Sequence, residues 1–230
     1  MRMKKILLFL LIFCAIATAQ EIPKNKYGLQ VIENIEIYKK LIAEDSSKAL
    51  IDLEKFIPGI KLDIRYATEN NFTGQKVYTL AKAFVRLPVA EALKLIQNKL
   101  MKDGFELKIF DAYRPYDATA LFYEIYRDTN FVASVWTGSR HNRGCAIDLT
   151  IVHTATGEEL IMPTPYDDFT EKANPGYMDL PDDVIHNRSI LIRIMEKYGF
   201  KVINSEWWHF DFNDWKNFEL MNISFEELMK

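Results

Sequence analysis

The order of strand and helix patterns along the chain constrains its fold most. Short strand patterns lie at residues 49–53, 60–66, 107–113, 145–152 and 200–212, and helical patterns lie at 35–43, 88–102, 116–127 and 182–198. The two kinds do not alternate as the strand–helix–strand units of a parallel sheet require. The order therefore predicts an α+β fold in which helices flank a small antiparallel sheet.

Turn and cap residues support these boundaries. Pro88 suits the first turn of a helix, and Gly104 follows the end of that helical pattern. Gly199 ends the last helical pattern, since glycine is the common residue after a helix C-terminus. Pro58-Gly59 separates the first two strand patterns as a turn.

The first 19 residues have the pattern of a cleaved secretory signal. Three basic residues precede an apolar run from Ile6 to Ile16, and Ala17-Thr18-Ala19 has small residues at a cleavage site. The apolar run is shorter than the roughly 20 residues that a membrane span needs. We therefore expect a mature chain that begins at Gln20, is secreted across the inner membrane to the periplasm and contains no membrane span.

Charge and cysteine content narrow the possible partners. The expected signal carries three of the 29 lysines and arginines and none of the 32 acidic residues, so its loss moves the net charge from −3 to −6. This balance provides no basic surface for a nucleic acid. Cys145 is the one cysteine left after the signal, so the fold depends on its core rather than on a disulfide. The oligomeric state is not fixed by the sequence.

The chain is expected to form one domain. Residues 20–48 are polar and mixed in pattern and are interpreted as an N-terminal extension. The strand and helix patterns that alternate irregularly occupy residues 49–230, which we interpret as a single domain.

Two polar segments contain the residues suited to a metal site. One runs from Ser139 to Asp148 and the other from Glu206 to His209. A catalytic zinc takes three protein ligands, commonly histidine and carboxylate, and leaves a position for water. His141, Asp148 and His209 can supply these ligands to one Zn²⁺ per chain, and Glu206 can accept the proton of the water.

This site makes demands on the backbone. Gly144 allows a sharp turn between His141 and Asp148. Glu206 and His209 are three residues apart and would face opposite sides of a regular strand. If both serve one site, we expect a bulge or turn between them.

Arg114 lies where a strand pattern ends before Pro115. A guanidinium at such a place can bind a carboxylate or stabilise an oxyanion. A structural ion pair with Asp111 is the alternative.

The three motifs together resemble one family. The motifs are Asp111-x-Tyr113-Arg114-Pro115, Ser139-x-His141-x-x-Gly144-x-Ala146-x-Asp148 and Glu206-x-Trp208-His209. They are similar to motifs of the VanX-like D-alanyl-D-alanine dipeptidases, a subfamily of peptidase family M15. The resemblance continues through 65–74, 156–158 and 188–200 and spans about residues 50–212. It implies the zinc peptidase fold shared by D,D-carboxypeptidases and hedgehog signalling domains.

The resemblance also implies a role for each site residue. Zinc is expected at His141, Asp148 and His209, with Glu206 as general base and Arg114 as the group that stabilises the tetrahedral intermediate. The remaining residues are expected to bind the substrate: Glu206, Asp167 and Tyr66 at its ammonium group, Ser139 at its carboxylate, and Tyr78 lining the site. Arg140 and Cys145 depart from the residues expected of the family, and Cys145 is either a soft metal contact or a buried structural thiol.

Three functions follow from these residues. The first is zinc-dependent hydrolysis of D-alanyl-D-alanine to two D-alanines outside the cytoplasm, in turnover of peptidoglycan fragments. The second is a zinc D,D-carboxypeptidase or endopeptidase acting on peptidoglycan stem peptides, which would need an open groove where Asp167 and Tyr66 are expected to close the site. The third is a zinc-binding recognition module without catalysis, which would need neither Glu206 nor Arg114.

Overall fold

The structure of the protein is a computed structural model that describes residues 22–230. The expected signal segment at 1–19 and the expected mature terminus at Gln20 lie outside the described residues. Within residues 22–230, every helix is too short or too polar to cross a membrane.

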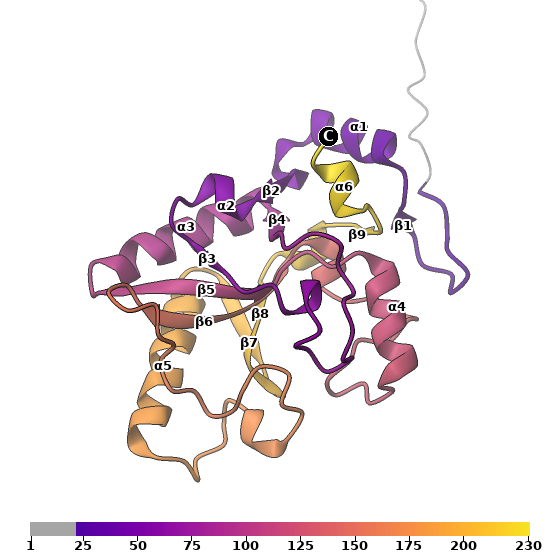
Figure 1. Ribbon diagram of the computed structural model, residues 1–230. Coiled ribbons are helices and arrows are strands. Elements are labelled where there is room, and N and C mark those ends of the chain that lie inside the picture. Colours follow the sequence, from indigo (N-terminus) through magenta and orange to yellow (C-terminus); the bar gives the residue numbers. More distant parts are fainter. Residues whose placement is uncertain (1–21) are drawn as a thin grey trace, which may run out of the picture.

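A five-stranded sheet forms the centre of the molecule (Figure 1). Its strands are arranged in the order β3 (Lys61–Leu62), β5 (Phe105–Asp111), β6 (Ala146–His153), β8 (Glu206–Phe212) and β7 (Phe200–Ile203). The three pairs from β5 to β7 are antiparallel, while the two-residue edge strand β3 runs parallel to β5. The predicted α+β fold is confirmed, with one parallel pair at the sheet edge.

Two long helices pack against this sheet, α3 (Leu87–Met101) and α5 (Asp182–Lys197), and the shorter helix α4 (Tyr116–Ile125) follows β5 along the chain. α3 contacts β5, and α5 contacts β7. α3 begins with Pro88 in its first turn and buries Val89, Leu93, Ile96 and Leu100. These apolar residues recur three or four positions apart and therefore form one face, which packs into the core.

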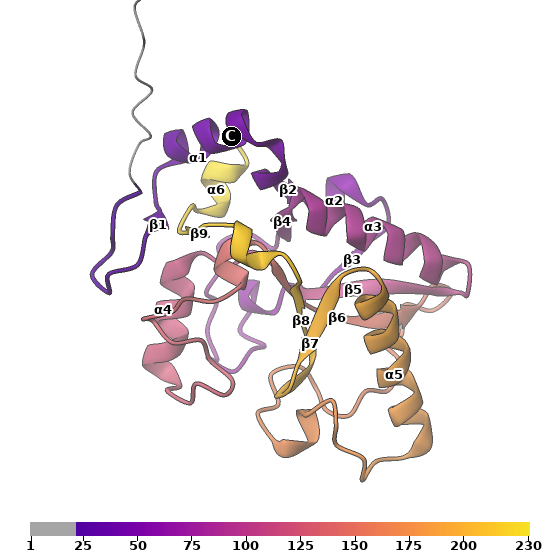
Figure 2. The same ribbon diagram turned by 180° about the vertical axis from the view of Figure 1, so that it is seen from behind.

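The two ends of the described chain meet at one side of the molecule. β1 (Val31–Ile32) pairs in parallel with β9 (Leu220–Met221), and α1 (Ile35–Glu44) lies at the same end as α6 (Phe225–Leu228) in Figures 1 and 2. Ile32 is fully buried. The part of the expected extension that is described, residues 22–48, therefore packs as part of the folded unit.

Shorter elements complete the fold. β2 (Leu50–Asp52) pairs with β4 (Phe84–Arg86) in a separate antiparallel ribbon, and α2 (Leu53–Phe56) follows β2. Five 3₁₀ turns are described: η1 (Ser46–Lys48), η2 (Arg65–Ala67), η3 (His141–Arg143), η4 (Glu171–Ala173) and η5 (Trp215–Asn217).

The strand predicted at 60–66 is wrong beyond Leu62. The chain leaves the sheet and forms η2, in which Tyr66 is 2% exposed. The Tyr66 carbonyl accepts hydrogen bonds from the backbone N–H groups of Val77 and Tyr78, at 2.9 and 2.8 Å. These contacts with a distant loop replace a sheet ladder, and the Tyr66 side chain points toward Asp167.

Candidate metal centre

A row of three polar residues crosses the central sheet. Asp111 on β5 lies opposite Asp148 on β6, and Asp148 lies opposite His209 on β8. Phe110 is an extra residue in β5 at this point, because Ile109 pairs with Leu149 and Asp111 with Asp148. Residues directly opposite in neighbouring strands have side chains on one face. The register therefore gathers two carboxylates and an imidazole.

His141 joins this row from the 3₁₀ turn η3 that precedes β6. Gly144 follows the turn with a φ of 67°, in the left-handed region that glycine adopts readily, and its N–H donates to the His141 carbonyl. This tight reversal brings His141 to the start of the strand that carries Asp148.

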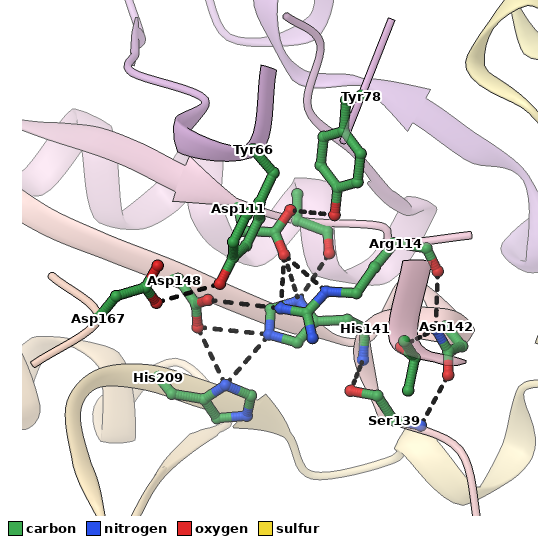
Figure 3. Close-up of polar contacts among 12 residues, drawn as sticks. Tyr66, Tyr78, Asp111, Arg114, Ser139, His141, Asn142, Asp148, Asp167 and His209 are labelled. Atoms are coloured by element: carbon green, nitrogen blue, oxygen red, sulfur yellow. Dashed lines mark hydrogen bonds and ion pairs between the residues drawn. The ribbon is translucent and has the colours of Figure 1, made fainter. Parts of the chain in front are cut away.

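The potential ligand atoms converge (Figure 3). Asp148 Oδ1 lies 3.3 Å from His141 Nε2 and 3.0 Å from His209 Nδ1, and the two nitrogens are 3.1 Å apart. Among the residues from 22 to 230, these three groups form a cluster whose ligand atoms all lie within 4.8 Å of one another. The predicted ligand set is therefore brought together.

The second polar atom of each ligand group is held by a neighbour. The Ala112 carbonyl accepts from His141 Nδ1 at 2.7 Å, Asp211 Oδ1 lies 3.1 Å from His209 Nε2, and the Tyr166 hydroxyl donates to Asp148 Oδ2 at 2.8 Å. Asp148 Oδ1 is buried, and the polar atoms beside it are the ring nitrogens His141 Nε2 and His209 Nδ1. Such outer contacts fix the orientation of metal ligands and leave their free atoms for the ion.

The charges in this cluster favour a bound cation. Burial acts to raise the pKa of Asp148, but the two histidines hold it well below its usual range. Burial acts to lower the pKa of His209, but hydrogen bonds to Asp148 and Asp211 raise it to about 10. The carboxylate thus holds a proton on its neighbour, and a divalent cation would replace that proton. Two imidazoles and one carboxylate form a donor set that suits catalytic zinc.

Glu206 lies beside the cluster because β8 is irregular. Val202 pairs with Phe210 while the next residue, Ile203, pairs with Glu206, so residues 207–209 of β8 have no counterpart in β7. This confirms the expected bulge, and it brings Glu206 Oε2 to 3.8 Å from His209 Nδ1. Burial raises the pKa of Glu206 to about 8; His209 opposes the rise, and Asp148 and Asp167 add to it. A carboxyl group with such a pKa can exchange protons near neutral pH.

Arg114 makes the ion pair that was considered as the alternative to a catalytic role. Its Nε and Nη2 donate to Asp111 Oδ2 at 3.0 and 2.7 Å. The same guanidinium lines the cavity that contains the candidate metal ligands and lies 4.7 Å from the Phe122 ring centre. The ion pair therefore orients Arg114 without removing it from the cavity.

Tyr78 is not brought to the cavity. Its hydroxyl donates to Asp111 Oδ1 at 2.9 Å, and its ring lines a different hollow beside α4 and α6. Tyr78 is thus placed to orient Asp111 rather than to line the site as expected.

Asp167 and Tyr66 form a wall of the cavity. The Tyr66 hydroxyl donates to Asp167 Oδ1 at 3.1 Å, and the Phe72 N–H donates to Oδ2 at 3.4 Å. Asp167 has a φ of 62°, which is uncommon for a residue other than glycine and is typical of strained functional positions. Burial raises the pKa of Asp167 to about 7 and keeps the pKa of Tyr66 well above 10.

Ser139 lies on the other side of the candidate metal ligands from Asp167 (Figure 3). Its Oγ accepts from the His141 N–H at 3.2 Å, which leaves the hydroxyl proton free to donate. Its own N–H donates to Asn142 Oδ1 at 2.7 Å. The cavity between Ser139 and Asp167 has a volume of about 110 Å³, and its lining includes Phe72, Phe131 and Phe169.

Several residues that shape the site were not predicted from the sequence. Asp211 lies two positions beyond His209 on β8. This spacing puts both side chains on one face of the strand, so the sequence does contain a signal for this contact. Tyr166 and Asn142 lie outside the regular strands and helices and gave no periodic signal. Cys145 is fully buried with its pKa raised by burial to about 12, and it lies outside the metal cluster, so it is a structural thiol.

The fold and site together define a class of protein. Two histidines and an aspartate converge on one point, and a separate glutamate and an arginine face the same small cavity. These are the components of a metallopeptidase centre.

Comparison with known proteins identifies the family. The sequence model of the D-ala-D-ala dipeptidases, peptidase family M15, matches residues 46–227. The D-alanyl-D-alanine dipeptidase of Escherichia coli K12 is 33% identical over 176 residues, which cover 76% of this chain and 91% of that protein. That of Enterococcus faecium is 29% identical over 182 residues, covering 70% and 90%. The chain therefore belongs to the D-alanyl-D-alanine dipeptidase family of M15 metallopeptidases.

Proposed function

We propose that the protein hydrolyses D-alanyl-D-alanine to two D-alanines with one zinc ion held by His141, Asp148 and His209. The observation that carries this proposal is the convergence of three free ligand atoms in a small cavity that also contains Glu206. The named activity of the relatives supports the same substrate.

Zinc, when bound, would polarise the scissile carbonyl and lower the pKa of water toward about 7. Glu206 accepts the proton of the attacking water and then donates a proton to the leaving amine. Its position beside His209 and its raised pKa suit both steps. Arg114, oriented by Asp111, stabilises the negative charge that develops on the carbonyl oxygen.

The two ends of the cavity suit the two ends of a free dipeptide. Asp167 and Tyr66 bind the ammonium group, and Ser139 donates to the carboxylate. The contacts of Asp167 with Tyr66 and with the Phe72 backbone close the ammonium end. A longer peptide would bury Asp167 without a charged partner, which costs binding free energy. This wall favours a dipeptidase over an enzyme that trims stem peptides.

The secretory pattern at residues 1–19 leads us to propose that the reaction takes place outside the cytoplasm. There the substrate would come from reactions that release D-amino acid dipeptides from peptidoglycan fragments. The protein would then recover D-alanine from wall turnover.

The test uses the full mature chain loaded with zinc and compares its hydrolysis of three substrates. D-Ala-D-Ala should be hydrolysed, and D-Ala-D-Ala-D-Ala and an N-acylated stem peptide should be cleaved at least about 100-fold less efficiently. A chelator should abolish the activity and added zinc should restore it. Preferential cleavage of the stem peptide would contradict the proposal.

A second arm tests the general base. Glu206→Gln should lower kcat by about 10²- to 10⁴-fold while the bound zinc, measured by elemental analysis, stays at the wild-type amount. An unchanged kcat would exclude Glu206 from proton transfer. Glu226→Gln, which changes an exposed residue of α6, is the matched control and should leave kcat unchanged.

A further inference from the structure

Arg140 lies between a predicted substrate-binding residue, Ser139, and a metal ligand, His141. It lines the metal cavity and also an adjoining groove that runs toward Trp215. Its side chain is 48% exposed. This cation lies at the edge of the site and takes no part in the proposed hydrolysis steps.

The charges around the cavity are unevenly distributed. Asp167 and Glu206 are two of the carboxyl groups that line it. Arg114 and Arg140 are the two arginines that line the cavity, and Asp111 receives two hydrogen bonds from Arg114. Arg114 is thereby largely neutralised by its own partner.

The Arg140 guanidinium contacts the described chain through only part of its surface. Its Nε lies 3.5 Å from Asp211 Oδ2, and its guanidinium carbon lies 4.9 Å from the Trp215 ring centre. Its contacts with the rest of the described chain thus leave the two terminal nitrogens available. Stacking on an indole restricts a guanidinium and leaves its N–H groups able to make a bidentate contact with a carboxylate.

We propose that Arg140 is a specificity-determining residue that binds the terminal carboxylate of the substrate, together with the Ser139 hydroxyl. The inference rests on the proposed dipeptidase function. Figure 3 shows Asp167 on one side of the metal ligands and Ser139 on the other. A zwitterionic dipeptide that spans the ligands thus has its ammonium group at Asp167 and its carboxylate beside Arg140.

A positioning role through Asp211 is the competing explanation. Asp211 contacts both Arg140 and His209, so loss of Arg140 could disturb a metal ligand. A positioning role would affect every substrate equally and would lower zinc affinity. A carboxylate-binding role affects only substrates that have the carboxylate, and mainly through KM.

The experiment compares D-Ala-D-Ala with D-alanyl-D-alaninamide in the zinc-loaded wild type and in Arg140→Ala. We expect the wild type to favour the free acid by about 10- to 100-fold in kcat/KM, as suits a charge-assisted hydrogen-bonded contact. Arg140→Ala should lose most of this preference through a higher KM for the acid, and Arg140→Lys should keep part of it. If the amide is not cleaved, its inhibition constant as a competitor gives the comparison.

Lys216→Ala is the matched control. Lys216 is an exposed cation 5.6 Å from the same Trp215 ring, and it lines the adjoining groove but not the metal cavity. This variant should keep the wild-type preference, zinc content and unfolding temperature.

Two results would overturn the inference. One is an acid-over-amide preference that survives in Arg140→Ala. The other is an equal loss for both substrates with reduced zinc content, which would assign Arg140 to positioning His209. A wild-type enzyme that cleaves neither compound would instead contradict the proposed function itself.

Discussion

Asp148 illustrates how the surroundings of one residue define its role. One of its carboxylate oxygens accepts from Tyr166, while the other is buried and faces two imidazole nitrogens. A buried carboxylate oxygen is costly unless a proton donor or a cation compensates its charge. In His141 and His209, likewise, one ring nitrogen contacts a neighbouring oxygen and the other faces the cluster. The positions of single atoms therefore suit this cluster to hold a metal ion.

Asp167 leads to a prediction about pH. Burial raises its pKa to about 7, so this carboxyl group is neutral below that pH and able to bind an ammonium group above it. The ratio of kcat/KM for D-Ala-D-Ala in the wild type to that in Asp167→Asn should fall about tenfold per unit as the pH drops from 7 to 5. Asp167→Asn also removes a charge that raises the pKa of Glu206, so the same ratio is measured for kcat alone, to separate proton transfer from ammonium binding. A ratio that does not change with pH would exclude Asp167 from ammonium binding.

At the scale of elements, two irregular strands and one tight turn assemble the site. The extra residue in β5 aligns Asp111 with Asp148, and the bulge in β8 turns Glu206 and His209 toward the same point. Gly144 then reverses the chain between His141 and β6. Bulges of this kind direct side chains at the cost of regular pairing.

The turn at Gly144 gives a test with a built-in control. A Cβ at Gly144 would lie 2.6 Å from Leu50 Cδ2 and 3.4 Å from the Arg86 backbone nitrogen, whereas one at Gly74 would meet nothing within 4 Å. Both glycines have a similar positive φ, 67° and 65°. Gly74→Ala should therefore cost about 1 kcal/mol in the free energy of unfolding, and Gly144→Ala about 2–4 kcal/mol. Urea unfolding measures both, and equal losses would show that crowding at Gly144 is unimportant.

At the scale of the whole molecule, the two ends of the described chain close one side of the domain. β1 pairs with β9, and the Tyr113 hydroxyl both donates to the Ile223 carbonyl and accepts from its N–H. Tyr113 directly precedes Arg114. The terminal segments are thereby joined to the strand end that carries a site residue.

Ile32 tests whether the N-terminal segment belongs to the folded unit. It is fully buried against the core, whereas Ile161 is 65% exposed. We expect Ile32→Ala to lower the free energy of unfolding by about 2–5 kcal/mol and Ile161→Ala to change it by less than about 0.5 kcal/mol. Denaturant unfolding compares them, and a loss at Ile32 as small as that at Ile161 would mean that residues 22–48 contribute little to stability.

The sequence predicted the long elements well because their periodicity reports burial directly, as in α3. It failed where long-range contacts decide local structure: residues 64–66 leave the sheet because the loop at 77–78 binds the Tyr66 backbone. The three residues of the candidate metal cluster were predictable from residue type and spacing, and the structure brings them together. The outer contacts of Tyr166 and Asn142 were not, since they depend on segments that only the folded chain brings to the site.

The zinc content of purified protein tests the central claim most directly. After removal of metal and reconstitution, the wild type should bind one zinc per chain, as measured by elemental analysis. His141→Ala should bind less than about one tenth of that amount, since a three-ligand catalytic site loses one of its ligands. His153→Ala, which changes an exposed histidine at the end of β6, should still bind one zinc. Full zinc occupancy in His141→Ala, or none in the wild type, would contradict the account.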